Sequence, residues 1–270
     1  MNLLLTSVNW ATVGIALAIV AALAVVFAVL IVLVSKICAV KEDPDVEFVK
    51  EKLAQANCGG CGFAGCADFA KALAEGKADL SMCGPTPAEN KAEIAKRLNL
   101  EYSAGAASCA VVHCAGGIVC LDKFNYMGDK GCAQQNNYMG GKKACSFGCL
   151  GDGTCAQSCN YNAIKVVDEV AVTDTDLCVA CGLCVKKCPK RLISFVPKNI
   201  GVYIACSSEC KGKEVMGACK AGCIGCGLCA KNCPSGAITM VNNLPVIDYD
   251  KCTSCKTCVA KCPRKCIKTF

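Results

Sequence analysis

Cysteine is the residue type in this chain that is most able to bind a metal or an iron–sulfur cluster. The 270 residues include 29 cysteines and a single histidine, His113, so thiolates are the only soft ligands present in quantity. Many cysteines lie in closely spaced runs, and one of the most regular is GCIGCGLCAKNCP, from Gly222 to Pro234. Clustered thiolates bind zinc or iron–sulfur clusters. The runs therefore predict metal or cluster sites held by cysteine.

The spacing of the cysteines narrows the type of site. A disulfide scaffold is disfavoured because the total is odd and neighbouring C-x-x-C thiols usually share a metal. A Rieske centre needs two histidines and c-type haem attachment needs C-x-x-C-H, and the sequence contains neither. Gaps of two, two and three residues followed by proline are typical of [4Fe–4S] binding. We therefore predict [4Fe–4S] clusters and a reducing compartment.

The fourth cysteine of each run is predicted to serve a different cluster from the first three. In two-cluster bacterial ferredoxins, three cysteines of a run bind one cluster and the fourth binds its neighbour, because the chain turns away before the proline. Applied to the last two runs, this rule predicts one cluster on Cys223, Cys226, Cys229 and Cys262. It predicts a second cluster on Cys252, Cys255, Cys258 and Cys233.

An upstream pair of runs repeats this arrangement. The distance from Cys159 to Cys178 is nineteen residues, as is the distance from Cys233 to Cys252, and the segments CNYNAIKVV and CPSGAITMV align. The same rule predicts clusters on two upstream sets: Cys145, Cys149, Cys155 and Cys188, then Cys178, Cys181, Cys184 and Cys159. Asn160 stands where the other runs have proline, and the first run has unusual gaps. A [3Fe–4S] or altered-potential centre therefore stays an alternative there.

A separate cysteine group, CGGCGFAGC with a distant fourth member, precedes the runs. Its glycines allow a tight loop around a cluster, and its spacing favours iron–sulfur over zinc, which would also accept four cysteines. The predicted ligands are Cys58, Cys61, Cys66 and Cys83. About five [4Fe–4S] clusters are thus expected. Nine cysteines remain: Cys38, Cys109, Cys114, Cys120, Cys132, Cys206, Cys210, Cys219 and Cys266. A sixth cluster within residues 109–132 is left open, whereas Cys266 aligns with alanines and is predicted to be a packing residue.

The N-terminal segment is predicted to cross a membrane. Residues 11–34 carry no charge over 24 positions, which is long enough for a spanning helix. No Lys or Arg precedes them and the apolar run exceeds that of a signal peptide, so an uncleaved anchor is expected. Lys36 and Lys41 follow, and the positive-inside rule then places the N-terminus outside and the cluster domains in the cytoplasm. We predict a single-pass protein of the cell (inner) membrane.

Short elements are expected to position the cysteines. Apolar spacing predicts helices over 44–56 and 87–98, and alternating stretches predict hairpins within AIKVVDEVAVTD and AITMVNNLPVID. The predicted fold is α+β, with one transmembrane helix, a small helical [4Fe–4S] domain and two bacterial-type 2x[4Fe–4S] ferredoxin modules. The predicted segments are an anchor (1–36), an N-terminal [4Fe–4S] domain (37–102), a Gly/Cys-rich insertion (103–144), a first module (145–199), a linker (200–221) and a second module (222–270).

Positive charge is concentrated in the second half. The formal net charge is +7, and from Cys178 onward there are fifteen basic and four acidic residues. This charge could offset the negative charge of the clusters, or it could form a docking face for an acidic partner such as a small soluble ferredoxin. Both interpretations stay open.

Several of these features together resemble one known family. The N-terminal span, NCGGCGFAGC with its distant cysteine, and the module ending in CP-x-x-C-I resemble the B subunit of the Rnf complex, the ion-translocating ferredoxin:NAD oxidoreductase of bacterial membranes. Residues of about 103–221 would be an insertion, as in the longer clostridial-type members. The resemblance implies an electron carrier that takes electrons from reduced ferredoxin. It would relay them to the other Rnf subunits (A, C, D, E and G), which reduce NAD and transport Na⁺ or H⁺.

Other functions are less well supported by the sequence. We find no G-x-G-x-x-G, P-loop or H-E-x-x-H motif, so no catalytic residue and no cofactor beyond the clusters is predicted in this chain. One alternative is the B subunit of the related complex that reduces a redox-sensing transcription factor, although the extra module favours the energy-conserving form. Another is the iron–sulfur subunit of a different membrane oxidoreductase, against which the 58–83 group argues. A zinc-binding or nucleic-acid-binding protein is disfavoured by the membrane span and the scarcity of aromatics near the basic residues.

Overall fold

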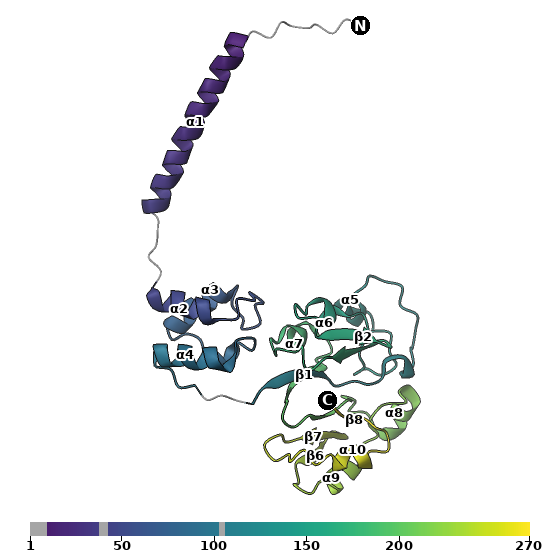
Figure 1. The fold of residues 1–270 in the computed structure, drawn as a ribbon. Helices are drawn as coiled ribbons and strands as arrows, with labels where there is room; N and C mark the ends of the chain where they lie inside the picture. The colour runs from purple at the N-terminus through teal and green to yellow at the C-terminus, as the bar shows by residue number, and fades with distance from the viewer. Residues whose placement is uncertain (1–9, 38–42, 103–105) are drawn as a thin grey trace, which may run out of the picture. The chain divides into compact units, whose positions relative to one another are not determined.

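A computed structural model describes residues 10–37, 43–102 and 106–270 (Figure 1). The chain divides into two units, Met1–Pro44 and Asp45–Phe270. The first contains α1 (Trp10–Ile37), in which Val13–Ser35 has a mean hydropathy of 3.4. A helix of that length is about 35 Å long and exceeds the roughly 30 Å of a bilayer core. Its large apolar side chains are exposed, so the helix is long and apolar enough to cross a membrane. Cys38 and Lys41 lie outside the described residues.

Residues 45–102 form a small helical domain around the first cysteine group. Its elements are α2 (Pro44–Lys52), α3 (Cys66–Ala74), η1 (Leu80–Met82) and α4 (Ala88–Leu98). Val49, Phe69 and Ile94 come one from each α-helix and are fully buried in the core. Both predicted helices are present. The first ends earlier than expected because Gln55 and Asn57 adopt left-handed backbone, with φ of +51° and +44°.

Residues 108–197, here called the first repeat, place a hairpin and short helices between two paired terminal strands. Strand β1 (Ser108–Val112) pairs antiparallel with β4 (Ile193–Pro197), so that the two ends of the repeat meet. Between them lie η2 (Gly117–Val119), α5 (Cys132–Asn137), α6 (Thr154–Gln157), the strands β2 (Ile164–Val167) and β3 (Val170–Thr173), and α7 (Leu183–Lys187). Strand β1 falls in the segment for which only an irregular insertion was expected.

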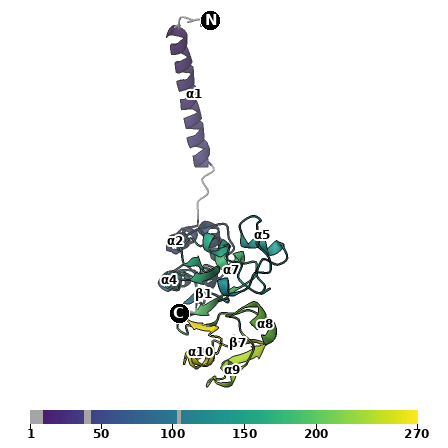
Figure 2. The same cartoon turned by 90° about the vertical axis from the view of Figure 1, so that its right-hand side faces the viewer.

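Residues 202–269, here called the second repeat, have the same layout. Strand β5 (Val202–Ile204) pairs antiparallel with β8 (Ile267–Thr269). The intervening elements are α8 (Gly212–Ala218), α9 (Leu228–Lys231), the strands β6 (Ile238–Val241) and β7 (Leu244–Ile247), and α10 (Thr257–Lys261). Both Figure 1 and Figure 2 show α9, α10 and β7 grouped together. Strand β5 lies in the segment expected to be a linker.

The two predicted hairpins are present, and their turns are alike. Strands β2 and β3 are joined at Asp168 and Glu169, and β6 and β7 at Asn242 and Asn243. All four residues have positive φ, between +47° and +64°, which is the geometry of a two-residue type I′ turn. Such a turn matches the twist of its strands, so it fixes their register. Glu169 is an unusual residue for this backbone, and its carboxylate is held by Lys142 at 2.7 Å and Lys143 at 2.5 Å.

Buried cysteines form part of the core of both repeats. The largest cluster of buried residues in the second repeat contains five cysteines (Cys206, Cys223, Cys229, Cys258 and Cys266) beside aliphatic residues such as Val202 and Ile267. The core of the first repeat likewise includes Cys155 and Cys184. The short strands and helices therefore enclose buried thiols together with aliphatic side chains.

Candidate metal centres

The first cysteine group lies in the loop before α3 and in the turn after η1. Gly59 and Gly62 have φ of +67° and +95°, and the Gly62 N–H donates to the Gly59 carbonyl at 3.0 Å. Asn57 Oδ1 accepts from the backbone N–H of Cys66 at 2.9 Å, which fixes the start of the helix. The tight loop thus presents its three thiols at one end of the helical domain.

Cys83 joins this loop from the far side of η1. Burial raises the pKa of its thiol, which lies near Cys61 and 3.1 Å from Thr86 Oγ1. Burial raises the pKa of Tyr161 in the first repeat, and the Cys58, Cys83 and Cys66 thiols add to the shift. The described fold therefore brings the four predicted ligands into one region.

In the first repeat, Cys159 lies with the run that follows it. Cys159, Cys178, Cys181 and Cys184 all line one small cavity. Burial, together with the nearby Cys178 and Cys181 thiols, raises the pKa of the Cys184 thiol to about 12. The Ala110 backbone N–H donates to Cys178 Sγ at 3.3 Å. This grouping agrees with the crossed arrangement, because Cys159 belongs in sequence to the preceding run.

The second repeat has the same crossing. Cys262 lines a small cavity together with the earlier run, Cys223, Cys226 and Cys229. Cys233, the fourth cysteine of that run, instead lies near Cys255, and Cys258 lies near both Cys255 and Cys252. Each fourth cysteine is thus grouped with the other run.

Cys266 lies against the first of these groups. Its side chain is 2% exposed, and its Sγ is 3.5 Å from Cys262 Sγ. A hydrogen bond with Cys266 also lowers the pKa of the Cys223 thiol to about 6. Cys266 therefore contacts two predicted ligands from the packed side of the cavity, which is compatible with the packing role expected for it.

The first run of the first repeat differs from the expected grouping. Burial raises the pKa of the Cys155 thiol to about 12, and the neighbours that add to the shift are Cys149, Cys132 and Cys188. Cys145 is absent from these neighbours. A turn lies between Cys145 and Cys149 in the chain, and in it the Gly148 N–H donates to the Cys145 carbonyl at 3.0 Å. The structure therefore groups Cys132, from the expected insertion, with three of the four predicted ligands.

Cys145 instead lines a cavity of about 220 Å³ where the two repeats meet. Six cysteines line this cavity: Cys114, Cys120, Cys145, Cys206, Cys210 and Cys219. Burial raises the pKa of the Cys145 thiol, and the nearby Cys114 and Cys219 thiols contribute. A hydrogen bond from Cys120 lowers the pKa of the Cys219 thiol to about 6. The five other than Cys145 lie outside the predicted ligand sets, and two of them, Cys114 and Cys120, belong to residues 109–132, for which a sixth cluster was left open.

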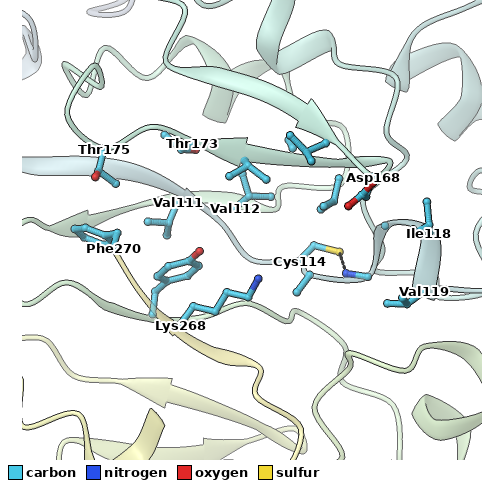
Figure 3. A pocket seen from close by; sticks show the side chains of 18 residues that line it. Val111, Val112, Cys114, Ile118, Val119, Asp168, Thr173, Thr175, Lys268 and Phe270 are labelled. Atoms are coloured by element: carbon cyan, nitrogen blue, oxygen red, sulfur yellow. Dashed lines mark hydrogen bonds between the residues drawn. The ribbon is translucent and has the colours of Figure 1, made fainter. Parts of the chain in front are cut away.

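Two of the cavity cysteines occupy equivalent places in the repeats. Cys114 follows the end of β1 by two residues, and Cys206 follows the end of β5 by two residues. Cys114 Sγ accepts from the N–H groups of Gly116 and Cys149, both at 3.4 Å, and Figure 3 shows the Gly116 contact. Cys206 Sγ accepts from Ser208 (3.5 Å) and Cys223 (3.3 Å). Paired N–H donors stabilise a thiolate, which is the form that binds metal. Comparing the segments VVHC and YIAC as parts of a repeat could have revealed this equivalence.

Two further features lie near the junction of the repeats. Cys109 is fully buried between the predicted ligand Cys178 and the ring of Tyr249, which itself lies near Cys252. A second cavity of about 330 Å³ is lined mainly by residues 114–119 and the β2–β3 hairpin, with the end of β1 and with Lys268 and Phe270 near the chain end (Figure 3). Among the described residues, no three cysteine, histidine or carboxylate side chains are close enough to hold a single metal ion.

Three protein families match separate parts of the chain. An Fe–S cluster family matches residues 53–85, which contain the first cysteine group. A 4Fe-4S binding domain matches residues 171–194, and a 4Fe-4S dicluster domain matches residues 222–266. The dicluster match includes both runs of the second repeat.

Whole-length comparison identifies the family. The B subunit of the Na(+)-translocating ferredoxin:NAD(+) oxidoreductase complex of Acetobacterium woodii is 37% identical over 244 residues, covering 90% of this chain and 73% of the relative. The B subunit of the proton-translocating ferredoxin:NAD(+) oxidoreductase complex of Clostridium ljungdahlii is 39% identical over 250 residues, 91% of this chain and 88% of the relative. The B subunit of the ion-translocating oxidoreductase complex of Methanosarcina acetivorans is 37% identical over 254 residues, 93% and 96% of the two chains.

The chain belongs to the B-subunit family of ion-translocating oxidoreductase complexes. The resemblance predicted from the cysteine motifs is therefore confirmed. As a member of the B-subunit family with 4Fe-4S domains, the chain is an iron–sulfur electron-transfer component of an oxidoreductase. Its cysteine groups supply the thiolates that such clusters require.

Proposed function

We propose that the chain accepts electrons from reduced ferredoxin and relays them to the other subunits of a membrane complex that reduces NAD⁺ and translocates Na⁺ or H⁺. The observation that carries this proposal is the crossed grouping of the cysteines, with Cys159 beside 178–184 and Cys262 beside 223–229. Crossed runs are the ligand pattern of two-cluster ferredoxins. The two relatives named as ferredoxin:NAD(+) oxidoreductase subunits support the same function.

We infer that the cysteines hold six [4Fe–4S] clusters. A bound [4Fe–4S] cluster supplies one-electron oxidation and reduction with little rearrangement. The proposed ligand sets are Cys58, Cys61, Cys66 and Cys83; Cys132, Cys149, Cys155 and Cys188; Cys159, Cys178, Cys181 and Cys184; Cys114, Cys145, Cys206 and Cys219; Cys223, Cys226, Cys229 and Cys262; and Cys233, Cys252, Cys255 and Cys258. Cys145 thus moves from its expected set to the cavity between the repeats, and Cys132 takes its place.

The second repeat is proposed to receive the ferredoxin. Cys226 and Cys255 are the exposed cysteines of the described chain. The protein layer that covers their two cysteine groups is therefore thinnest at these residues. The exposed Lys231 and Lys261 end α9 and α10 close to these groups. Lysines in this position would attract an acidic electron donor and orient it toward the exposed Cys226 and Cys255.

The place of α1 in the sequence supports delivery of electrons at the membrane. The sequence places Lys36 and Lys41 after the span, so we propose an external N-terminus and cytoplasmic repeats. The helical domain with Cys58 follows the anchor directly in sequence. We propose that this domain is the last part of the chain through which electrons pass before the membrane-bound subunits.

Replacing Cys58 with alanine tests this order. In the assembled complex, we expect reduced ferredoxin still to bleach most of the visible iron–sulfur absorbance of the variant chain, because the second repeat is intact. NAD⁺ reduction should fall by at least about 100-fold, since a ligand of the delivering site is lost. Cys109→Ala, which removes a buried thiol outside the six sets, is the control. If Cys58→Ala abolished bleaching as well, the proposed order would be wrong.

Replacing Cys206 with serine tests the site between the repeats. The anaerobically purified variant should contain about four fewer iron atoms and sulfides per chain than the wild-type protein. Cys210→Ser is the matched control, because Cys210 lines the same cavity but lies outside the proposed set. The assignment fails if Cys206→Ser keeps its full iron content, or if Cys210→Ser loses as much iron.

A further inference from the structure

Two glycines of the helical domain contact the first repeat. A methyl group on Gly60 would overlap the carbonyl oxygen of Cys181, and one on Gly84 would overlap the carbonyl oxygen of Ala180. The methyl group on Gly84 would also lie 3.0 Å from the Val179 carbonyl oxygen. Gly60 lies between the ligands Cys58 and Cys61, and Gly84 directly follows Cys83. The contact therefore joins two cysteine loops, one from the helical domain and one from the first repeat.

Backbone conformation does not account for glycine at these two positions. Neither Gly60 nor Gly84 has a positive φ, whereas Gly59 and Gly62 in the same loop do. An alanine could adopt the backbone of Gly60 and Gly84 if nothing stood opposite. Only the closeness of the Val179–Cys181 carbonyl groups requires the absence of a side chain.

Four further observations describe the same contact. Lys186, on α7, donates from Nζ to the Gly60 carbonyl at 2.8 Å. Ala180 has φ of +55°, an uncommon backbone for alanine that turns this loop at the contact. Burial raises the pKa of Tyr161, and thiols of both groups, Cys58 and Cys181, add to the shift. The Cys58 and Cys181 thiols are themselves electrostatic neighbours.

We propose that Gly60 and Gly84 are positioning residues that seat the 58–83 cysteine loops on the 178–184 loop of the first repeat, with Lys186 holding the contact. This inference rests on the proposed relay, for which it names the junction between the helical domain and the repeats. The 159/178/181/184 group becomes the neighbour of the delivering site. At Gly60 and Gly84 the facing backbones approach too closely for a side chain on either residue.

The test compares Gly60→Ala and Gly84→Ala with Gly217→Ala in the full chain carrying its clusters. Gly217, on α8, has no atom within 4 Å of the added methyl group and no positive φ, so it is the matched control. Hydrogen exchange is measured by mass spectrometry over residues 57–66 and 178–186. We expect exchange at both segments to rise about tenfold in the two variants, with unchanged iron content, and no change in the control. In the fully reduced protein, magnetic interaction between the two clusters should weaken by EPR.

A second variant covers the case in which an alanine at Gly60 or Gly84 causes iron loss. Lys186→Met removes the hydrogen bond to the Gly60 carbonyl without altering either cysteine loop, and Lys186→Arg should restore it. We expect the same rise in exchange in Lys186→Met and recovery in Lys186→Arg. Wild-type exchange and EPR interaction in Lys186→Met, or in an iron-replete Gly60→Ala protein, would overturn the proposal. These measurements use neither ferredoxin nor NAD⁺, so the contact and the proposed function can fail separately.

Discussion

Replacing Cys233 with alanine is expected to damage the cluster of Cys252, Cys255 and Cys258, and to spare the one beside it in sequence. Cys233 lies near Cys255, whereas Cys223, Cys226 and Cys229 share their cavity with Cys262. A cluster with three thiolates and one open corner is labile, so its remaining ligands become free. Anaerobic alkylation with iodoacetamide followed by mass spectrometry should label Cys252, Cys255 and Cys258 nearly completely and leave the other set protected.

Two companion variants sharpen this result. Cys262→Ala should reverse the pattern and expose Cys223, Cys226 and Cys229 to alkylation. Cys266→Ala, which removes a buried thiol that contacts the same cavity, should leave both sets protected. Labelling of Cys223, Cys226 and Cys229 in Cys233→Ala would mean that each run holds its own cluster and that the crossed assignment is wrong.

Removal of iron should unfold both repeats. Their cores include buried cysteines beside aliphatic residues, and burial raises the pKa of thiols such as Cys155 and Cys184 to about 12. Without iron these thiols are buried polar groups beside short strands, because the free energy of binding metal is also free energy of folding. An anaerobic chelator should therefore abolish amide-exchange protection in β1, β4, β5 and β8.

The helical domain provides the internal comparison for iron removal. Its core is built around aromatic and aliphatic residues such as Phe69, Leu73 and Ile94, and Cys83 is the one cysteine among its buried residues. We expect α3 and α4 to keep measurable protection in the apoprotein, at a level well above that of the strands. Restoring iron and sulfide under reducing conditions should return protection to the repeats. If the strands remained protected without iron, the thiol-rich cores would be stable by themselves.

Local patterns predicted the local structure well. The uncharged run indicated α1, helical spacing indicated α2 and α4, and alternation indicated both hairpins. In each of these cases, the residues that determine the element lie next to one another in the chain. The internal repeat of the cysteine runs led to the prediction of crossed ligand sets, and Cys159 and Cys262 each line a cavity with the other run of their repeat.

Pairings between distant residues were not predicted. Ser108 pairs with Pro197 and Val202 pairs with Thr269, and neither pair is joined by a turn that a sequence pattern could reveal. Cys132 was considered only for an open sixth cluster, because its position near Cys149 and Cys155 depends on the packing of α5 against the runs. The cavity between the repeats was missed for the same reason, since its cysteines come from segments that lie far apart in the chain.

The meeting of the repeats at Cys114 and Cys206 also sets an order of biosynthesis. Cys114 and Cys145 leave the ribosome long before Cys206 and Cys219, so the proposed cluster between the repeats cannot be completed while only the first repeat has been translated. The 58–83 group has all its ligands much earlier. Cluster-loading machinery would therefore find the helical domain ready first and the site between the repeats only later. A cell short of iron would accumulate chains whose anchor and first domain are mature but whose relay is interrupted in the middle.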